Sequence, residues 1–118
     1  MNIDPELTQA FNSKPRVDIN SIKKMTPGQM DSVKSYGSQA ENLLKNKEFA
    51  LFVHHFKFEL TDELSNISGH TDADDRKRVS IAHNINGIDK FIASLRQAVW
   101  FKDRVVSIQN APADMKGE

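Results

Sequence analysis

Hydrophobic residues recur along the C-terminal half of the chain at alternating steps of three and four, which is the spacing of one helix face. Lys102 occupies the only polar position in this stripe. Further positions at seven-residue steps widen the stripe along one flank and indicate a broad buried face. The stripe consists of Ile81, Ile85, Ile88, Ile92, Leu95, Val99 and Val106, and its flank consists of Asn84, Phe91, Ala98 and Val105. The pattern predicts one long helix over residues 72–109.

A matching hydrophobic face lies earlier in the chain and predicts a second long helix over residues 27–67. Thr26 and Gln29 mark its start, because a Thr and a Gln at this spacing can form a capping box. Between the two helices, Gly69 suits the left-handed residue that ends a helix, and Thr71 can cap the next one. The face consists of Phe49, Val53, Phe56, Leu60, Leu64 and Ile67. Two helices of similar length joined by a short loop predict an antiparallel helical hairpin.

Three places in these helices carry residues that can interrupt a helix, namely Gly37, residues 45–47 and residues 86–87. The Asn-Gly pair at 86–87 is ordinarily a turn signal. The hydrophobic stripe nevertheless stays in phase from Ile85 to Ile88, so we expect one continuous helix through this point.

The first 25 residues resemble an arm rather than part of a core. Asp4 followed by Pro5 starts a short helix, which residues 12–15 end, because Pro15 and its predecessor resist helix formation. Residues 17–22 show partial alternation, and we expect them to be extended and to lie on another part of the protein.

At the other end, residues 110–118 are polar, have no packing pattern and are expected to form a disordered tail. The sequence thus predicts an all-α fold with an extended N-terminal arm at 1–25 and an antiparallel helical hairpin at 26–109. We expect this hairpin to associate into an oligomeric helical bundle.

A second line of apolar residues runs along the predicted helix at 27–67, roughly opposite its first face. A helix that is apolar on two sides contacts two layers, and one hairpin partner covers only one of them. The second layer must be the N-terminal arm, another subunit or a different protein. Trp100, beside the stripe of the later helix, is either covered by the arm or an anchor for a partner, since Trp is enriched in binding hot spots. The predicted partner or oligomer interface consists of Val33, Ala40, Leu44, Leu51, His54, His55, Phe58 and Trp100.

Composition narrows the range of partners and chemistries. The 118 residues fit one domain, and 16 Lys plus Arg balance 16 Asp plus Glu. A formal net charge of zero gives no general field that would draw the chain to nucleic acid or to an anionic membrane. The absence of cysteine removes disulfides, thiolate nucleophiles and cysteine-based metal sites. The N-terminal residues lack a secretion signal and no apolar run approaches the ~20 residues of a membrane span, so we expect neither secretion nor membrane insertion.

The adjacent His54 and His55 are the first candidates for chemistry. Neighbours in a helix point about 100° apart, so the two cannot chelate one ion together. His55 shares a face with Glu59 and Asp62, but a metal site there needs another ligand from a second chain or from a distant histidine. The distant histidines considered are His70 and His83. The simpler interpretation places both histidines at the edge of a packed face. With no catalytic motif in the sequence, we predict no enzyme, cofactor or metal.

The basic triplet at 76–78 raises the alternative of a nucleic-acid-binding accessory, such as a packaging or regulatory subunit. Acidic residues at 72–75 immediately precede the triplet, and pairing of acids with bases along a helix describes the segment better. Nucleic acid is therefore not the favoured partner. The other bases that could join such a surface are Lys14, Arg16, Lys23 and Lys24.

The stretch YGSQAENLLKN at 36–46, the aromatic helix after it, SGHTD at 68–72 and FKDRV at 101–105 resemble small uncharacterised α-helical proteins of tailed bacteriophages. The resemblance covers about residues 30–106 as an overall pattern and transfers no functional residue. It implies a role as a virion component, in morphogenesis or in host takeover. The implied location is the host cytoplasm or the virion. The expected function is non-enzymatic interaction or assembly, with partners being further copies of the chain or another viral or host protein.

Overall fold

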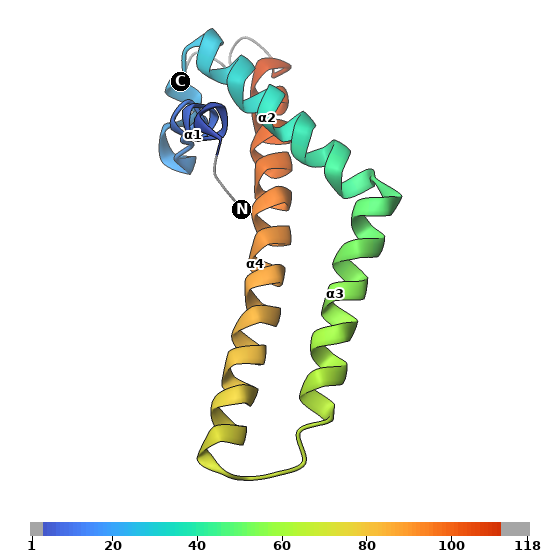
Figure 1. The fold of residues 1–118 in the computed structure, drawn as a ribbon. Coiled ribbons are helices and arrows are strands. Elements are labelled where there is room, and N and C mark those ends of the chain that lie inside the picture. The colour runs from blue at the N-terminus through green and yellow to red at the C-terminus, as the bar shows by residue number, and fades with distance from the viewer. Residues whose placement is uncertain (1–3, 112–118) are drawn as a thin grey trace. The chain divides into compact units, whose positions relative to one another are not determined.

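The computed structural model describes residues 4–111 and shows an all-helical protein, with no strand among these residues (Figure 1). Its elements are α1 (Pro5–Asn12), the 3-10 helix η1 (Ile19–Lys24), α2 (Pro27–Lys45), α3 (Lys47–Ser65) and α4 (Asp72–Gln109). The described residues fall into two compact units. The first unit contains residues 4–41 and 97–111, and the second contains residues 42–96. The all-α prediction is confirmed.

The second unit is built around α3 and the part of α4 up to Arg96, which run antiparallel to each other (Figure 1). Leu60 and Ile81 are its buried residues, with 6% and 4% of their surface exposed. The rings of Phe49 and Phe91 meet edge to face at 6.2 Å, and Lys57 Nζ lies 2.6 Å from Asp89 Oδ1. The predicted pairing of two hydrophobic faces is thus seen in this unit.

A single helix over 27–67 was predicted, and this prediction is wrong, because the chain leaves the helix at Asn46. Asn46 adopts an extended conformation, and its side-chain oxygen accepts a 2.9 Å hydrogen bond from Phe49 N–H. An Asn at this position satisfies an N–H of the first turn that has no partner inside the helix. The cap therefore ends α2 and starts α3. By contrast, Gly37 and Gly87 lie inside continuous helices, as expected for Gly87.

The loop between α3 and α4 is fixed by the start of α4. Thr71 and Asp74 form a reciprocal cap: Asp74 N–H donates to Thr71 Oγ1 at 3.1 Å, and Thr71 N–H donates to Asp74 Oδ2 at 3.1 Å. The cap predicted at Thr71 is confirmed. Gly69 does not have the predicted left-handed conformation, since no described glycine has a positive φ. The lack of a side chain at Gly69 instead lets the Asp74 carboxylate lie close to the backbone, because a Cβ there would collide with this carboxylate.

Arg78 also holds this loop, whereas the sequence predicted only that its basic triplet pairs with the preceding acidic residues. Its guanidinium donates to the carbonyl oxygens of Ile67, at 3.2 Å, and of Gly69, and also pairs with Asp75 Oδ1 at 2.7 Å. Planar guanidinium groups present several donors in a fixed geometry, which suits this multiple contact. Arg78 therefore links the loop to the first turns of α4.

The first unit has its own hydrophobic core, formed by Ile22, Val33 and Val105. Val105 is completely buried. The predicted short helix at the N-terminus is present as α1, with Asp4 accepting a 2.9 Å hydrogen bond from Glu6 N–H. The expectation of extended chain before residue 25 is wrong at η1, where the turn lets Ile22 enter the core. The partly buried residues around this core are Val17, Met25, Met30, Phe101 and Ile108.

Inside the first unit, α2 and α4 approach closely at Gly37. A Cβ on Gly37 would lie 2.7 Å from the carbonyl oxygen of Ala98 and would also collide with the Cβ of Lys102. Lys102, the polar position in the hydrophobic stripe, pairs with Glu41 one turn further along α2. The charge of Lys102 is therefore paired with Glu41 in the contact between α2 and α4 and is not isolated within an apolar face.

The predicted disordered tail begins at 110, and residues 112–118 lie outside the described part of the chain. Among the described helices, none has both the length and the apolar content needed to cross a membrane.

Candidate interaction surface

The residues predicted to form one interface separate into buried and exposed groups. Val33 and Ala40 are 2% and 4% exposed, and both lie in the first unit. A partner cannot reach them, so the interface prediction is wrong for these two residues. The physical reason is that one helical wheel was drawn across the break at Asn46, which joined an internal face of α2 to an exposed face of α3.

Leu44 and His54 line a groove of about 400 Å³ in the second unit. Apolar side chains of α3 and α4 form much of the groove, while polar and charged groups stand among them. Lys57 and Asp89 pair with each other there, as described above. Leu44 is half-buried at this groove, so it contributes to the surface of the second unit rather than to a free helix face. The lining residues also include Phe49, Val53, Ile92 and Arg96.

An exposed strip on α3 contains four members of the prediction, namely Leu51, His54, His55 and Phe58. Leu51 and Phe58 are 50% and 68% exposed, although they follow each other at a seven-residue step on one helix face. His54 and His55 are exposed between them, and the ring of His54 stacks on that of Phe58 at 6.4 Å and 28°. We define the outer strip of α3 as Lys47, Leu51, His54, His55, Phe58 and Asp62.

A shallow hollow lies at the C-terminal end of the outer strip, beside Phe58 and Asp62. All the residues that form it belong to α3, and the other contributors are Glu59, Thr61 and Ser65. Its position on the face away from Leu60, the buried residue of this helix, leaves it open to another molecule.

Phe52 is 72% exposed, yet the prediction did not include it. The helical wheel could have identified it, since Phe52 lies about 100° from Leu51 and about 80° from the buried Leu60. Leu7 and Phe11 of α1 are also exposed, at 62% and 65%, and α1 buries none of its residues. Leu7 and Phe11 lie four residues apart and so share one side of α1, a signal that was present in the sequence but was not part of the predicted interface.

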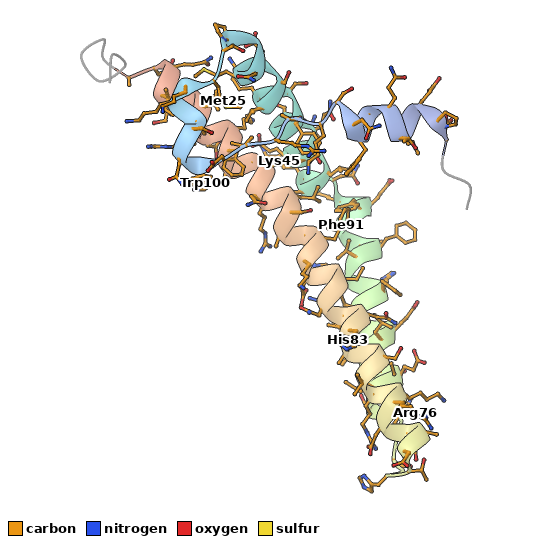
Figure 2. All side chains as sticks on the ribbon, turned by 90° about the vertical axis from the view of Figure 1, so that its left-hand side faces the viewer. Met25, Lys45, Arg76, His83, Phe91 and Trp100 are labelled. Carbon is orange, nitrogen blue, oxygen red and sulfur yellow. The ribbon has the colours of Figure 1, made fainter. Side chains whose placement is uncertain are left out.

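Trp100 lies on α4 in the first unit and is 50% exposed (Figure 2). Its ring meets that of Phe101 edge to face at 5.2 Å. Phe101 in turn packs against the buried core of this unit. One side of Trp100 is thus supported from within, and the other side is available to solvent.

The candidate metal ligands His55, Glu59 and Asp62 are all exposed on α3. His83, labelled on α4 in Figure 2, is exposed as well. Within residues 4–111, no group of three or more His, Asp or Glu side chains is arranged to hold a metal ion.

The charged cluster at the start of α4 is engaged in local structure. Arg76, labelled in Figure 2, donates from Nε to the backbone oxygen of Asp72 at 3.3 Å, and Arg78 holds the loop. Hydrogen bonds from the side chain of Thr71, and next from its backbone N–H, lower the pKa of Asp74 below its ordinary value of 3.8. These contacts stabilise the helix start and reduce the number of cations free to meet a phosphate.

Comparison of the chain with models of protein families, with curated proteins and with solved structures found no match. Function is therefore argued from the surface of the molecule itself.

Proposed function

We propose that this chain is a non-enzymatic interaction protein that assembles with other protein chains through the exposed face of α3. The observation that carries the proposal is the exposure of Leu51 and Phe58 on a helix whose opposite face is already occupied by its packing within the second unit. Apolar residues clustered on the surface of a folded domain mark sites of interaction.

The charge distribution supports a protein partner over a nucleic acid. The formal net charge is zero, and Lys57, Arg78 and Lys102 each pair with an acidic side chain. Binding to a phosphate backbone depends on unpaired cations that neutralise phosphates. An apolar strip bordered by histidines is instead suited to another helix.

The resemblance to small phage proteins adds a biological setting to this proposal. In this setting the chain takes part in the assembly of a virion or in the takeover of a host. It acts in the host cytoplasm or in the virion, and its partner is a second copy of the chain or another viral or host protein. No residue role is taken from this resemblance.

The proposal is tested by comparing the wild-type chain with the double variant Leu51→Asp/Phe58→Asp. Affinity-tagged forms of each are cross-linked in the producing cells, purified, and their partners are identified by mass spectrometry. We expect the double variant to lose specific partners while its circular dichroism at 222 nm stays helical, because both residues are exposed. Val79→Asp is the matched control, since Val79 is 55% exposed on α4 in the same unit.

The proposed role of α3 would be refuted by two results together. One is a wild-type chain that stays monomeric up to high micromolar concentration in light scattering. The other is a set of cross-linked proteins that is identical for wild type and the double variant.

A further inference from the structure

We infer that the outer strip of α3 binds the outer strip of a second copy of this chain, antiparallel, around a two-fold axis that passes between His54 and His55. This inference rests on the proposed function and names the partner. It follows from the order of residues along the strip, from their exposure and from their charges.

The outer strip is self-complementary when it is reversed. With the axis between His54 and His55, residues at equal distances from the axis face each other in the two copies. Leu51 of one copy then faces Phe58 of the other, and the relation repeats on the other side of the axis. A two-fold interface has this reciprocal character, since the same patch is used on both subunits. The two exposed apolar residues of each copy are covered by those of its partner.

The charges at the ends of the strip fit the same register. Lys47 of one copy faces Asp62 of the other, which gives two opposite-charge pairs per dimer. Within residues 4–111 neither side chain has an ion-pair partner, so both are available for this contact. Complementary charges at the rim fix the register and the orientation of an interface.

Other arrangements of two α3 helices fit less well. In a parallel pair every residue faces its own copy, so Lys47 meets Lys47 and Asp62 meets Asp62, which is repulsive. Moving the antiparallel register by seven residues in one direction leaves Leu51 opposite Ser65. Moving it by seven in the other direction takes the residue opposite Phe58 to position 44, beyond the start of α3.

The hollow beside Phe58 also lies where the partner strip would pass. In the proposed register its residues Thr61 and Asp62 face positions 48 and 47 of the partner, respectively, at the N-terminal end of the partner's α3. Helices that pack in this way insert side chains of one helix into spaces between side chains of the other. The open face of α3 thus supplies a space as well as apolar contact.

The apolar strip is short, so the expected dimer is weak. The exposed parts of Leu51 and Phe58 amount to on the order of 400 to 500 Å² over both copies, given the size of such side chains. Stable interfaces bury roughly 1,200 to 2,000 Å² in total. Polar contacts along α3 add to the apolar part, and we expect dissociation in the range of tens to hundreds of micromolar, at the low end of interface size.

The register is tested with single cysteines, because the natural chain contains none. Full-length Lys47→Cys and Asp62→Cys chains, one of them carrying a size tag, are mixed at about 200 µM, within the expected range of dissociation, and treated with a short bismaleimide linker. We expect the mixed Lys47→Cys with Asp62→Cys dimer to form at least about five times faster than either self-linked dimer. In this mixed dimer the second Lys47 and Asp62 pair remains intact.

Phe52→Cys serves as the matched control. Phe52 is as exposed as Phe58 but lies about a quarter turn from the strip, so it should link at the background rate. A charge exchange gives a second test by analytical ultracentrifugation. Lys47→Asp and Asp62→Lys should each weaken the dimer several-fold, and the double variant should return to wild-type affinity.

Self-linking of Lys47→Cys that matches the mixed reaction would overturn the antiparallel register, and equal linking of Phe52→Cys would show that contacts are not specific to the strip. Failure of the double charge variant to recover affinity would also overturn the inference. If no dimer forms but Leu51→Asp/Phe58→Asp still loses its cross-linked partners, the second copy is wrong and the proposed function stands. If no dimer forms and the double variant retains its cross-linked partners, both the dimer and the proposed function are wrong.

Discussion

Gly37→Ala is the substitution for which the structure gives the sharpest expectation. In a solvent-exposed helix, replacing Gly with Ala stabilises the folded state by about 1 kcal/mol, because Ala has the higher helix propensity. Gly37 is buried in α2, and its missing side chain is what allows α4 to approach. We therefore expect Gly37→Ala to destabilise the folded state, contrary to the usual effect of replacing Gly with Ala in a helix.

The size of the effect follows from the space available. A Cβ on Gly37 would stand 2.7 Å from Ala98 O, whereas ordinary contacts of this kind are 3.4–4 Å. Neither this backbone oxygen nor the Cβ of Lys102 can move without shifting α4. Overpacking of this kind costs typically 1–3 kcal/mol. Because a Cβ on Gly37 would collide with two atoms, we expect a cost in the upper part of this range, about 2–3 kcal/mol. After the gain of about 1 kcal/mol in helix propensity is subtracted, we expect a net destabilisation of about 1–2 kcal/mol, or a few degrees in Tm for a chain of this size.

The measurement uses urea unfolding followed by fluorescence of Trp100, the only tryptophan, which lies on α4 in the same unit. Gly28→Ala is the matched control, since Gly28 belongs to the same helix and a Cβ there meets nothing within 4 Å. We expect the two variants to shift the midpoint in opposite directions. If Gly37→Ala is as stable as Gly28→Ala, the helices do not approach at Gly37 and the described packing of the first unit is incorrect.

Three further predictions concern the caps and the loop of the second unit. Asn46→Ala should lower stability by about 1 kcal/mol in thermal unfolding, because it removes the cap of α3, whereas Asn46→Asp should restore most of it. Arg78→Met should lower the free energy of unfolding by about 1–2 kcal/mol, because it removes charged hydrogen bonds to the loop, and Arg78→Lys should restore only part of this loss. Equal stability of wild type, Arg78→Met and Arg78→Lys would contradict the role of Arg78. Because folding lowers the pKa of Asp74, its carboxylate stabilises the folded state above about pH 4, and this contribution is lost as pH falls through the lowered pKa. The urea midpoint of wild type should therefore exceed that of Asp74→Asn at pH 7, and the difference should shrink as the pH is lowered below about 4. A difference that stays the same across this range would be inconsistent with this cause.

Much of the helical fold could be predicted from periodicity and capping residues. The stripe from Ile81 onward predicted α4 through Asn86 and Gly87, because a helix face in phase on both sides of a weak residue outweighs its local preference. Thr26 with Gln29 and Thr71 with Asp74 mark helix starts by a mechanism that needs only local sequence. These are contacts between residues three apart, so no tertiary information is required.

The predictions failed at positions where tertiary packing determines whether a residue is helical or buried. Asn46 can act as an exposed residue within a helix or as a cap, and the local sequence does not distinguish these states. The burial of Val33 depends on Ile22 and on Val105, and Val105 lies in α4, far along the chain, so that the three meet only in the folded first unit. The candidate interface therefore lost its first two residues. Leu51 and Phe58 remained, because their exposure depends only on which face of α3 is turned inward.

The two units differ in a way that bears on the proposed dimer. The first unit buries Ile22, Val33 and Val105 together, with further apolar residues around them. The second unit, though about as large in residues, has only Leu60 and Ile81 below a tenth exposed. Two packed helices form a single layer of contact, and helices of this length derive most of their stability from tertiary packing. Covering the outer strip of α3 adds a second layer to the unit that has the smaller core. Any partner that binds only the folded hairpin stabilises it by mass action, so association and folding of the second unit are linked.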